Sequence, residues 1–179
     1  MNSYLGFTLT ECYIDTMLIQ LLLGNKVNHQ HSCNNVINNM RNKFNDDFAI
    51  GIIDNDKQRV SYLDEFQEIG ATRHLHFHSH PNGKHYIITI GLPRKAIDSF
   101  VLDCASDINL SMSSLGLPKT LKDFTRIAKD EKIYTDRRIK QLLSAIQWHD
   151  EIVKLKNVLC YLLQARYNAS ANEIMTLVQ

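Results

Sequence analysis

The stretch FAIGIIDND, residues 48–56, decides the fold predicted for this chain. Its apolar run from Phe48 to Ile53 has the length of a strand, and such an unbroken run is typical of a strand buried on both faces of a parallel sheet. The run ends in two aspartates, Asp54 and Asp56, separated by one residue. One interpretation is an acidic turn, because Asp often hydrogen-bonds its own backbone in turns. The other is half of a metal site at the end of the strand.

The residues before this strand predict two further units. A strand over residues 4–9 is followed by Glu11 and by a helix whose apolar residues recur at helical spacing, with Gly24 as its stop. Residues 28–32 form either a brief strand or a loop. Ser32 is a candidate cap for a second helix that ends before the central strand.

The residues after the central strand predict a hairpin and several helices. A third, short helix is expected over residues 60–69, and alternating runs around Asn82-Gly83 predict a β-hairpin over residues 74–90. Further helical patterns follow, over residues 97–105, 119–130 and 136–166, the last as one helix or two, and then a final short helix or frayed tail. We therefore expect an α/β domain over residues 1–105, with a mostly parallel sheet flanked by helices, and a helical C-terminal portion over residues 106–179 packed on it.

The composition is that of an ordinary globular protein. The 179 residues are 44% hydrophobic and 22% charged, and the net charge of +1 gives no global attraction to nucleic acid or to an anionic membrane. The four cysteines have no CxxC spacing, which favours reduced thiols in a cytoplasmic protein. The sequence shows neither a signal peptide nor an apolar stretch long enough to span a bilayer, so we expect a cytoplasmic location without a membrane partner.

Acidic residues follow two of the predicted strands. Glu11 comes after the first strand, and Asp54 and Asp56 come after the central one. Ligands of an open α/β sheet collect outside the carboxyl ends of its strands, so the three carboxylates converge if these strands are neighbours. Such clusters hold Mg²⁺ or Mn²⁺, which prefer oxygen ligands. Asp15, one helical turn after Glu11, is expected either to support that site or to form a salt bridge, and Lys57 either contacts a phosphate or is a solvated turn lysine.

The segments LTECYID, residues 9–15, and AIGIIDND, residues 49–56, together resemble the Toprim domain. That domain is the metal-binding module of topoisomerases, bacterial primases, recombination-mediator proteins and overcoming-lysogenisation-defect nucleases. Its pattern is a strand ending in Glu, an acidic residue one turn later, and a second strand ending in Asp-x-Asp. The resemblance covers the first domain and implies a Rossmann-like sheet, with Glu11 as general acid/base and metal ligand and with Asp54 and Asp56 as metal ligands.

The departures from the Toprim pattern indicate which relatives are the better analogues. Cys12 stands where the family often has Gly, and a side chain there can crowd an approaching phosphate. We also expect no ATPase domain of the kind found in the lysogenisation-defect nucleases, which makes small stand-alone Toprim-like proteins the better analogues.

The resemblance implies a Mg²⁺- or Mn²⁺-dependent protein that cleaves or transfers phosphodiester bonds of nucleic acid. The alternative is a catalytically degenerate Toprim-like module that acts through protein partners, in phage defence or in a mobile element. A phosphatase of the haloacid-dehalogenase type also uses a strand ending in Asp-x-Asp. That fold places the motif near the N-terminus, which disfavours it here.

Four histidines alternate along the predicted hairpin: His74, His76, His78 and His80. On a strand this spacing places all four imidazoles on one face. They form the solvated face of an edge hairpin, a transition-metal site joined by His85, or a surface that contacts phosphate. Zinc is the less favoured of these, because zinc sites usually recruit a ligand from elsewhere in the fold.

Basic residues are enriched between residues 94 and 140, where nearby acidic residues offset much of their charge. This stretch is either a solvated helical face or a surface that follows phosphates. The apolar periodicity from Ile139 to Leu163 is expected to pack on the sheet or on a second copy of the chain, which makes a homo-oligomer possible.

Overall fold

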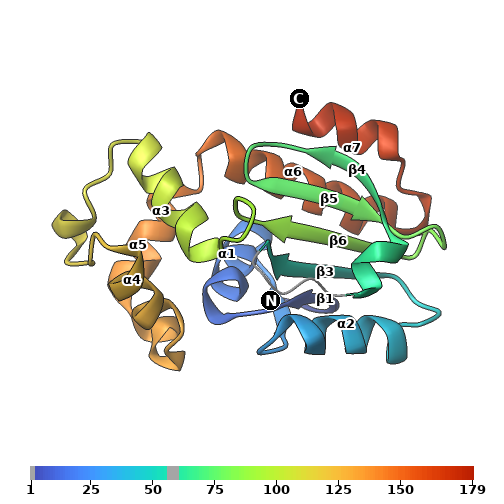
Figure 1. The fold of residues 1–179 in the computed structure, drawn as a ribbon, viewed down its shortest axis with the longest axis horizontal. Coiled ribbons are helices and arrows are strands. Elements are labelled where there is room, and N and C mark those ends of the chain that lie inside the picture. The colour runs from blue at the N-terminus through green and yellow to red at the C-terminus, as the bar shows by residue number, and fades with distance from the viewer. Residues whose placement is uncertain (1–2, 56–60) are drawn as a thin grey trace.

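The computed structural model describes residues 3–55 and 61–179, and a six-stranded sheet lies at the centre of these residues (Figure 1). The strand order is β2-β1-β3-β6-β5-β4. Four neighbouring strands run parallel: β2 (Lys26–His29), β1 (Tyr4–Thr10), β3 (Ala49–Asp54) and β6 (His85–Ile90). The strand β5 (Leu75–Ser79) pairs antiparallel with both β6 and β4 (Gln67–Ala71). The prediction of an α/β fold with a mostly parallel sheet is confirmed.

The strand β3 is central because its side chains are apolar on both faces. Ile50 and Ile52 join one buried cluster, whereas Ala49 and Ile53 join a second cluster on the opposite face. Gly51 lies between them, and a Cβ added there would come within 2.6 Å of the Met40 sulfur. A missing side chain thus permits close packing of a helix on this strand.

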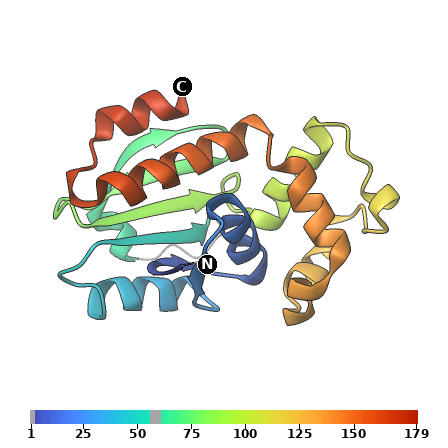
Figure 2. The same cartoon turned by 180° about the vertical axis from the view of Figure 1, so that it is seen from behind.

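Helices cover both faces of the sheet. The helix α1 (Tyr13–Leu23) and the helix α6 (Asp150–Ala165) lie over one face (Figure 2), and α2 (Cys33–Asn42) packs on the other. The predicted helix ends are confirmed: Gly24 ends α1 with a φ of 65°, and the Ser32 side chain accepts a hydrogen bond from the Asn35 N–H at the start of α2. The last helix, α7 (Ala171–Val178), packs against β4.

The remaining helices lie beyond the end of the sheet where the parallel strands finish (Figure 1). They are α3 (Ile97–Asp107), α4 (Leu121–Ala128) and α5 (Arg137–Ile146), joined by the short 3₁₀ helices η2 (Met112–Leu115) and η3 (Glu131–Thr135). The apolar pattern from Ile139 to Leu163 is divided between α5 and α6, and its main residues are buried within the chain. The two helices are separate because His149 starts α6 by accepting a hydrogen bond from the Glu151 N–H.

One predicted element is wrong. The short helix expected over residues 60–69 is instead the 3₁₀ helix η1 (Ser61–Glu65) followed by β4. Pairing with β5 overrides the local helical pattern, and Gly70, which directly follows the expected helix, lies inside the strand. As a result, the β5–β6 hairpin is confirmed but does not form the edge of the sheet. No helix in the two described ranges has both the length and the apolar character needed to cross a membrane.

Candidate functional site

A pocket of about 440 Å³ lies at the carboxyl ends of β1, β2 and β3. The segments leading into α1 and α3 and the end of α4 complete its walls. Its lining residues are Glu11, Cys12, Tyr13, His29, His31, Asp54, Ala96 and Lys129. The pocket therefore occupies the place where an open α/β sheet is expected to bind ligands.

The structure brings Glu11 and Asp54 together, as the sequence predicts for neighbouring strands. The strands β1 and β3 pair in parallel, with Thr10 opposite Ile52, so both acidic residues lie at the same edge. An Oε2 atom of Glu11 accepts a hydrogen bond from the Asp54 N–H at 3.0 Å. Asp54 Oδ1 accepts one from the Ile97 N–H at 2.9 Å, which fixes this carboxyl at the start of α3.

The surroundings of Asp54 disfavour its charged form. Burial, followed by the nearby charge of Glu11, raises the pKa of Asp54 to about 8, against the opposing hydrogen bond from the Ile97 amide. A cation bound between the two carboxyls would reverse this preference, because an opposite charge favours ionisation.

Asp15 holds the backbone that carries Glu11. It is 1% exposed, and its carboxyl oxygens accept hydrogen bonds from the N–H groups of Glu11 and Cys12, both at 2.9 Å. Burial raises the pKa of Asp15 to about 7, with the Cys12 amide opposing the shift and the Glu11 charge adding to it. Of the two expected roles, support of the carboxylate site is the one that this geometry provides.

Asp56 and Lys57, the other residues expected at this site, lie outside the described residues. Within residues 3–55 and 61–179, no group of three or more His, Cys, Asp or Glu side chains is arranged to hold a metal ion. Glu11 and Asp54 supply two carboxylates. They fit Mg²⁺ in donor type, since this ion usually keeps several waters and is bound by one or two carboxylates together with substrate phosphate.

The other wall of the pocket is aromatic and was not predicted. Thr10 of β1 pairs with His29 of β2, which places His29 beside Glu11. The ring of His29 lies 4.1 Å from that of His31 and 4.5 Å from that of Tyr13, measured between centroids. Like Glu11 and Asp54, His29 is at the carboxyl end of a parallel strand. Assigning residues 28–32 to a strand would have indicated that His29 lies at the same edge of the sheet as Glu11 and Asp54.

Two further residues complete the chemistry of the pocket. Lys129, at the end of α4, brings a positive charge, and that charge partly offsets the burial that raises the pKa of Asp98. Cys12 lies against the carboxylates, and burial, then Asp15 and Asp54, raise the pKa of its thiol. The thiol is therefore protonated at neutral pH.

The four hairpin histidines do not share one solvated face, so that expectation is wrong. His74 precedes β5 and is 1% exposed, between Asp103 of α3 at 3.3 Å and Glu151 of α6 at 3.5 Å. Helices packed on this side enclose it, which alternation along a strand cannot indicate.

The other three hairpin histidines are half-buried. His76 pairs with Glu68 at 2.8 Å and His80 with Glu65 at 3.4 Å. Burial lowers the pKa of His78 to about 4. Neither these residues nor His74 lines the carboxylate pocket, so the structure does not bring the histidines and the carboxylates together.

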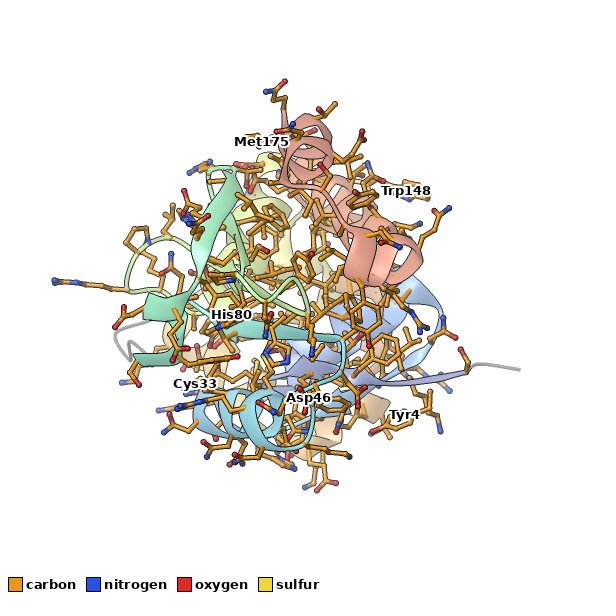
Figure 3. The ribbon with its side chains drawn as sticks, turned by 90° about the vertical axis from the view of Figure 1, so that its right-hand side faces the viewer. Tyr4, Cys33, Asp46, His80, Trp148 and Met175 are labelled. Carbon is orange, nitrogen blue, oxygen red and sulfur yellow. The ribbon has the colours of Figure 1, made fainter. Side chains whose placement is uncertain are left out.

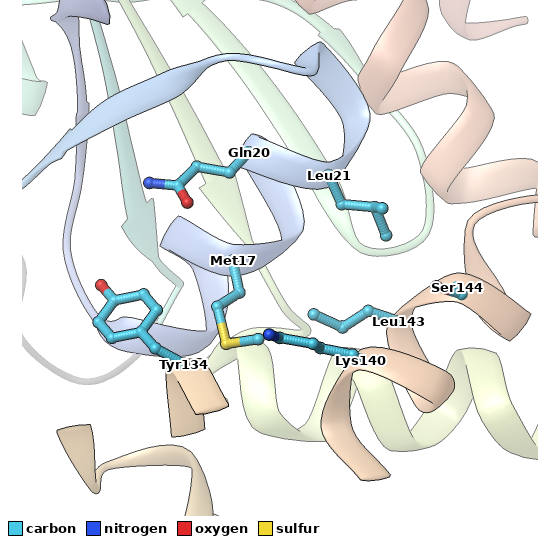
Figure 4. Close-up of a pocket in the computed structure, with 7 residues that line it drawn as sticks. All are labelled: Met17, Gln20, Leu21, Tyr134, Lys140, Leu143 and Ser144. Atoms are coloured by element: carbon cyan, nitrogen blue, oxygen red, sulfur yellow. The ribbon is translucent and has the colours of Figure 1, made fainter. Parts of the chain in front are cut away.

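A second pocket of about 420 Å³ lies between α1 and α5 (Figure 4). It is lined by Met17, Gln20, Leu21, Tyr134, Lys140, Leu143 and Ser144. None of the acidic or histidine residues proposed from the sequence as site residues lies in it, and its lining carries no acidic group. The carboxylate pocket is therefore the better candidate for metal and phosphate chemistry.

Comparison of the chain with protein-family models, curated proteins and solved structures gives no match. An assignment of function therefore rests on the fold and on the residues of the carboxylate pocket.

Proposed function

We propose that this chain is a Toprim-like protein that uses Mg²⁺ or Mn²⁺ to cleave phosphodiester bonds of nucleic acid. One observation carries the proposal: Glu11 and Asp54 follow two adjacent parallel strands and line the same pocket.

Three lining residues of the pocket, together with Asp15, have roles in this proposal. Asp54 and Glu11 would hold the ion, which would supply neutralisation of the phosphate charge and activation of water. Glu11 also takes up or donates a proton, and Asp15 fixes its backbone through two amide hydrogen bonds. Lys129 is available to bind a phosphate from the opposite side of the pocket.

A second candidate is the catalytically degenerate module acting through protein partners, in phage defence or in a mobile element. The hydrogen bonds of the two carboxyls favour it: Glu11 and Asp54 both accept backbone N–H groups, which would stabilise the fold without any metal. Cys12 also narrows the site where the Toprim pattern often has Gly. A degenerate module would neither bind Mn²⁺ at Asp54 nor cleave nucleic acid.

The test is cleavage of labelled single- and double-stranded DNA and RNA in the presence of Mn²⁺. We expect Glu11→Gln to slow cleavage about 100-fold or more, the typical loss when a general acid or base is removed, and Asp54→Asn to abolish it. Both changes keep an oxygen acceptor for the backbone N–H groups, so the melting temperature should stay near that of the unmodified chain.

The matched control is Asp46→Asn. Asp46 lies at the opposite end of the sheet (Figure 3), and its side chain is 85% exposed. Cleavage by this variant should equal that of the unmodified chain. If Glu11→Gln and Asp54→Asn cleave as fast as Asp46→Asn, the proposal is wrong.

A further inference from the structure

We infer that the pocket binds a nucleotide of an unpaired strand, with its base against the rings of Tyr13, His29 and His31 and its neighbouring phosphates along α4. We call the three rings the aromatic wall. This inference rests on the proposed function for what happens to the bound strand, but binding itself needs no metal and no cleavage.

The aromatic wall is a connected group of rings with one exposed member. The centroids of His29 and His31 are 4.1 Å apart, and those of Tyr13 and His31 are 5.8 Å apart. His31 is exposed, whereas Tyr13 and His29 are half-buried and contact its ring. The backbone of His31 has a φ of 66°, which is uncommon for a residue other than glycine and is often found at functional sites.

His29 carries a polar ring atom that suits contact with a base. Its Nε2 atom is buried and has no hydrogen-bond partner among the described residues. A buried polar atom of this kind needs a partner, which a water or a polar ligand in the pocket would supply.

A row of cations leads away from the pocket along α4. Lys122, Arg126 and Lys129 are spaced by four and three residues, so they lie on one helical face, and all three are exposed. The other face of α4 is buried through Phe124 and Ala128. We call these three residues the cationic face. It starts at Lys129 in the pocket and extends about 10 Å to Lys122.

Acidic residues near the cationic face do not prevent a phosphate from binding to it. Asp123 pairs with Arg126 at 3.4 Å, but both side chains are largely exposed, and such a pair contributes little stability. A phosphate can therefore replace Asp123 at low cost. Asp98, beside Lys129, is buried and therefore not on the exposed surface that a phosphate would approach, and burial raises the pKa of its carboxyl.

The geometry favours an unpaired strand over a duplex. A base can stack on His31 only when its own face is free, and in a duplex that face is covered by the next base pair. The volume of the pocket, about 440 Å³, is in the usual range for small-ligand sites, about 300–1,000 Å³. A single nucleotide fits this description better than a double helix.

The experiment is fluorescence anisotropy with labelled strands in EDTA, so that no metal-dependent cleavage occurs. The probes are a DNA strand, the RNA strand of the same sequence, the DNA duplex, and the DNA strand with abasic positions. We expect the full chain to bind unpaired strands at least 10-fold more tightly than the duplex or the abasic strand, in line with the usual effect of one stacked base. The DNA and RNA arms show which sugar is preferred.

Two variants separate the base contact from the phosphate contact. His31→Gly removes the ring and suits the positive φ, so it should weaken binding of the normal strand about 10-fold and leave binding of the abasic strand unchanged. Lys122→Ala should lower the slope of log affinity against log salt by about 0.7. The control Lys156→Ala, on α6, should bind like the unmodified chain.

Equal binding of the normal and abasic strands, or of single strand and duplex, would overturn the inference. So would unchanged binding by both His31→Gly and Lys122→Ala. The proposed function fails separately, because a chain that binds unpaired strands in EDTA but cleaves nothing in Mn²⁺ keeps the inference and loses the nuclease.

Discussion

At the scale of single residues, two carboxyls, the buried Asp15 and the half-buried Asp54, determine the charge of this site. The pKa of Asp54 is raised to about 8 and that of Asp15 to about 7, in both cases chiefly by burial. Each carboxyl nevertheless keeps hydrogen bonds from backbone amides, so its position is fixed while its charge is disfavoured. This combination suits a position at which a cation completes the charge balance.

These two groups predict that stability falls as the pH rises. Between the ordinary carboxyl pKa, near 3.8, and the raised values, the folded chain keeps protons that the unfolded chain releases. Unfolding is therefore favoured as the pH rises from about 4 to about 8, with a slope of at most about 1.4 kcal/mol per pH unit for each group.

Urea unfolding in EDTA between about pH 5 and pH 8 checks this prediction. The Asp54→Asn variant should lose less stability over that interval than the unmodified chain, because its amide does not ionise. If the free energy of unfolding changed with pH by the same slope in the two proteins, the pKa of Asp54 would not be raised in the folded chain.

At the scale of elements, local signals predicted the parts of the fold that are set locally. The apolar run of β3, the glycine stop of α1 and the serine cap of α2 are visible in the sequence because their causes lie within a few residues. The strand β4 was missed because its conformation depends on pairing with β5, and the spacing of its own side chains does not indicate that pairing. The same reason hid His29, whose four-residue strand is defined by pairing with β1.

The residues of the candidate site likewise fall into two groups, those with a local sequence signal and those placed by contacts between elements. Glu11 and Asp54 were predictable because each ends a recognisable strand. Lys129 reaches the pocket from a helix more than seventy residues further along the chain than Asp54, and no local pattern indicates that contact. The burial of His74 likewise depends on two helices that follow it.

The contact between α2 and β3 gives a prediction for a single methyl group. A Cβ on Gly51 would come within 2.6 Å of the Met40 sulfur and 3.0 Å of a Val36 methyl group, so Gly51→Ala must displace the Met40 side chain or α2 itself. We expect a loss of about 1–3 kcal/mol in the free energy of unfolding, as for other overpacked cores.

Chemical denaturation of Gly51→Ala beside Gly6→Ala tests this packing. The methyl group at Gly6 would meet the ring of Tyr4, which is exposed and free to move, so that variant should lose much less stability. Equal losses in the two variants would show that strand propensity, and not the approach of α2, sets the cost.

At the scale of the whole molecule, a buried polar cluster joins the sheet to the helices beyond it. Glu151 of α6 accepts hydrogen bonds from the Thr72 hydroxyl at 2.6 Å and from the His74 N–H at 3.1 Å. The ring of His74 lies between Glu151 and Asp103 of α3. This cluster holds α3 near the start of β5, and α3 in turn supplies the amide that binds Asp54.

Glu151→Ala should therefore cost about 1–3 kcal/mol of stability, because it leaves the half-buried Thr72 hydroxyl and the buried His74 amide without their acceptor. The matched control is Asp150→Ala. Asp150 is an adjacent acidic residue in the same helical turn, its side chain is 73% exposed, and we expect a change within about 0.5 kcal/mol. Thermal unfolding of the two variants side by side measures the difference, and equal losses would assign the effect to the helix dipole instead.

The central claim is that Glu11 and Asp54 together hold a divalent cation. Titration of Mn²⁺, followed by electron paramagnetic resonance at about pH 8, tests it, because a pKa of about 8 leaves Asp54 mostly protonated at lower pH, where the proton competes with the cation. We expect one bound ion per chain, binding weakened about 10-fold or more in Asp54→Asn and Glu11→Gln, and unchanged binding in Asp46→Asn. Equal Mn²⁺ affinity in the unmodified chain and in Asp54→Asn, or no binding by the unmodified chain, would contradict it.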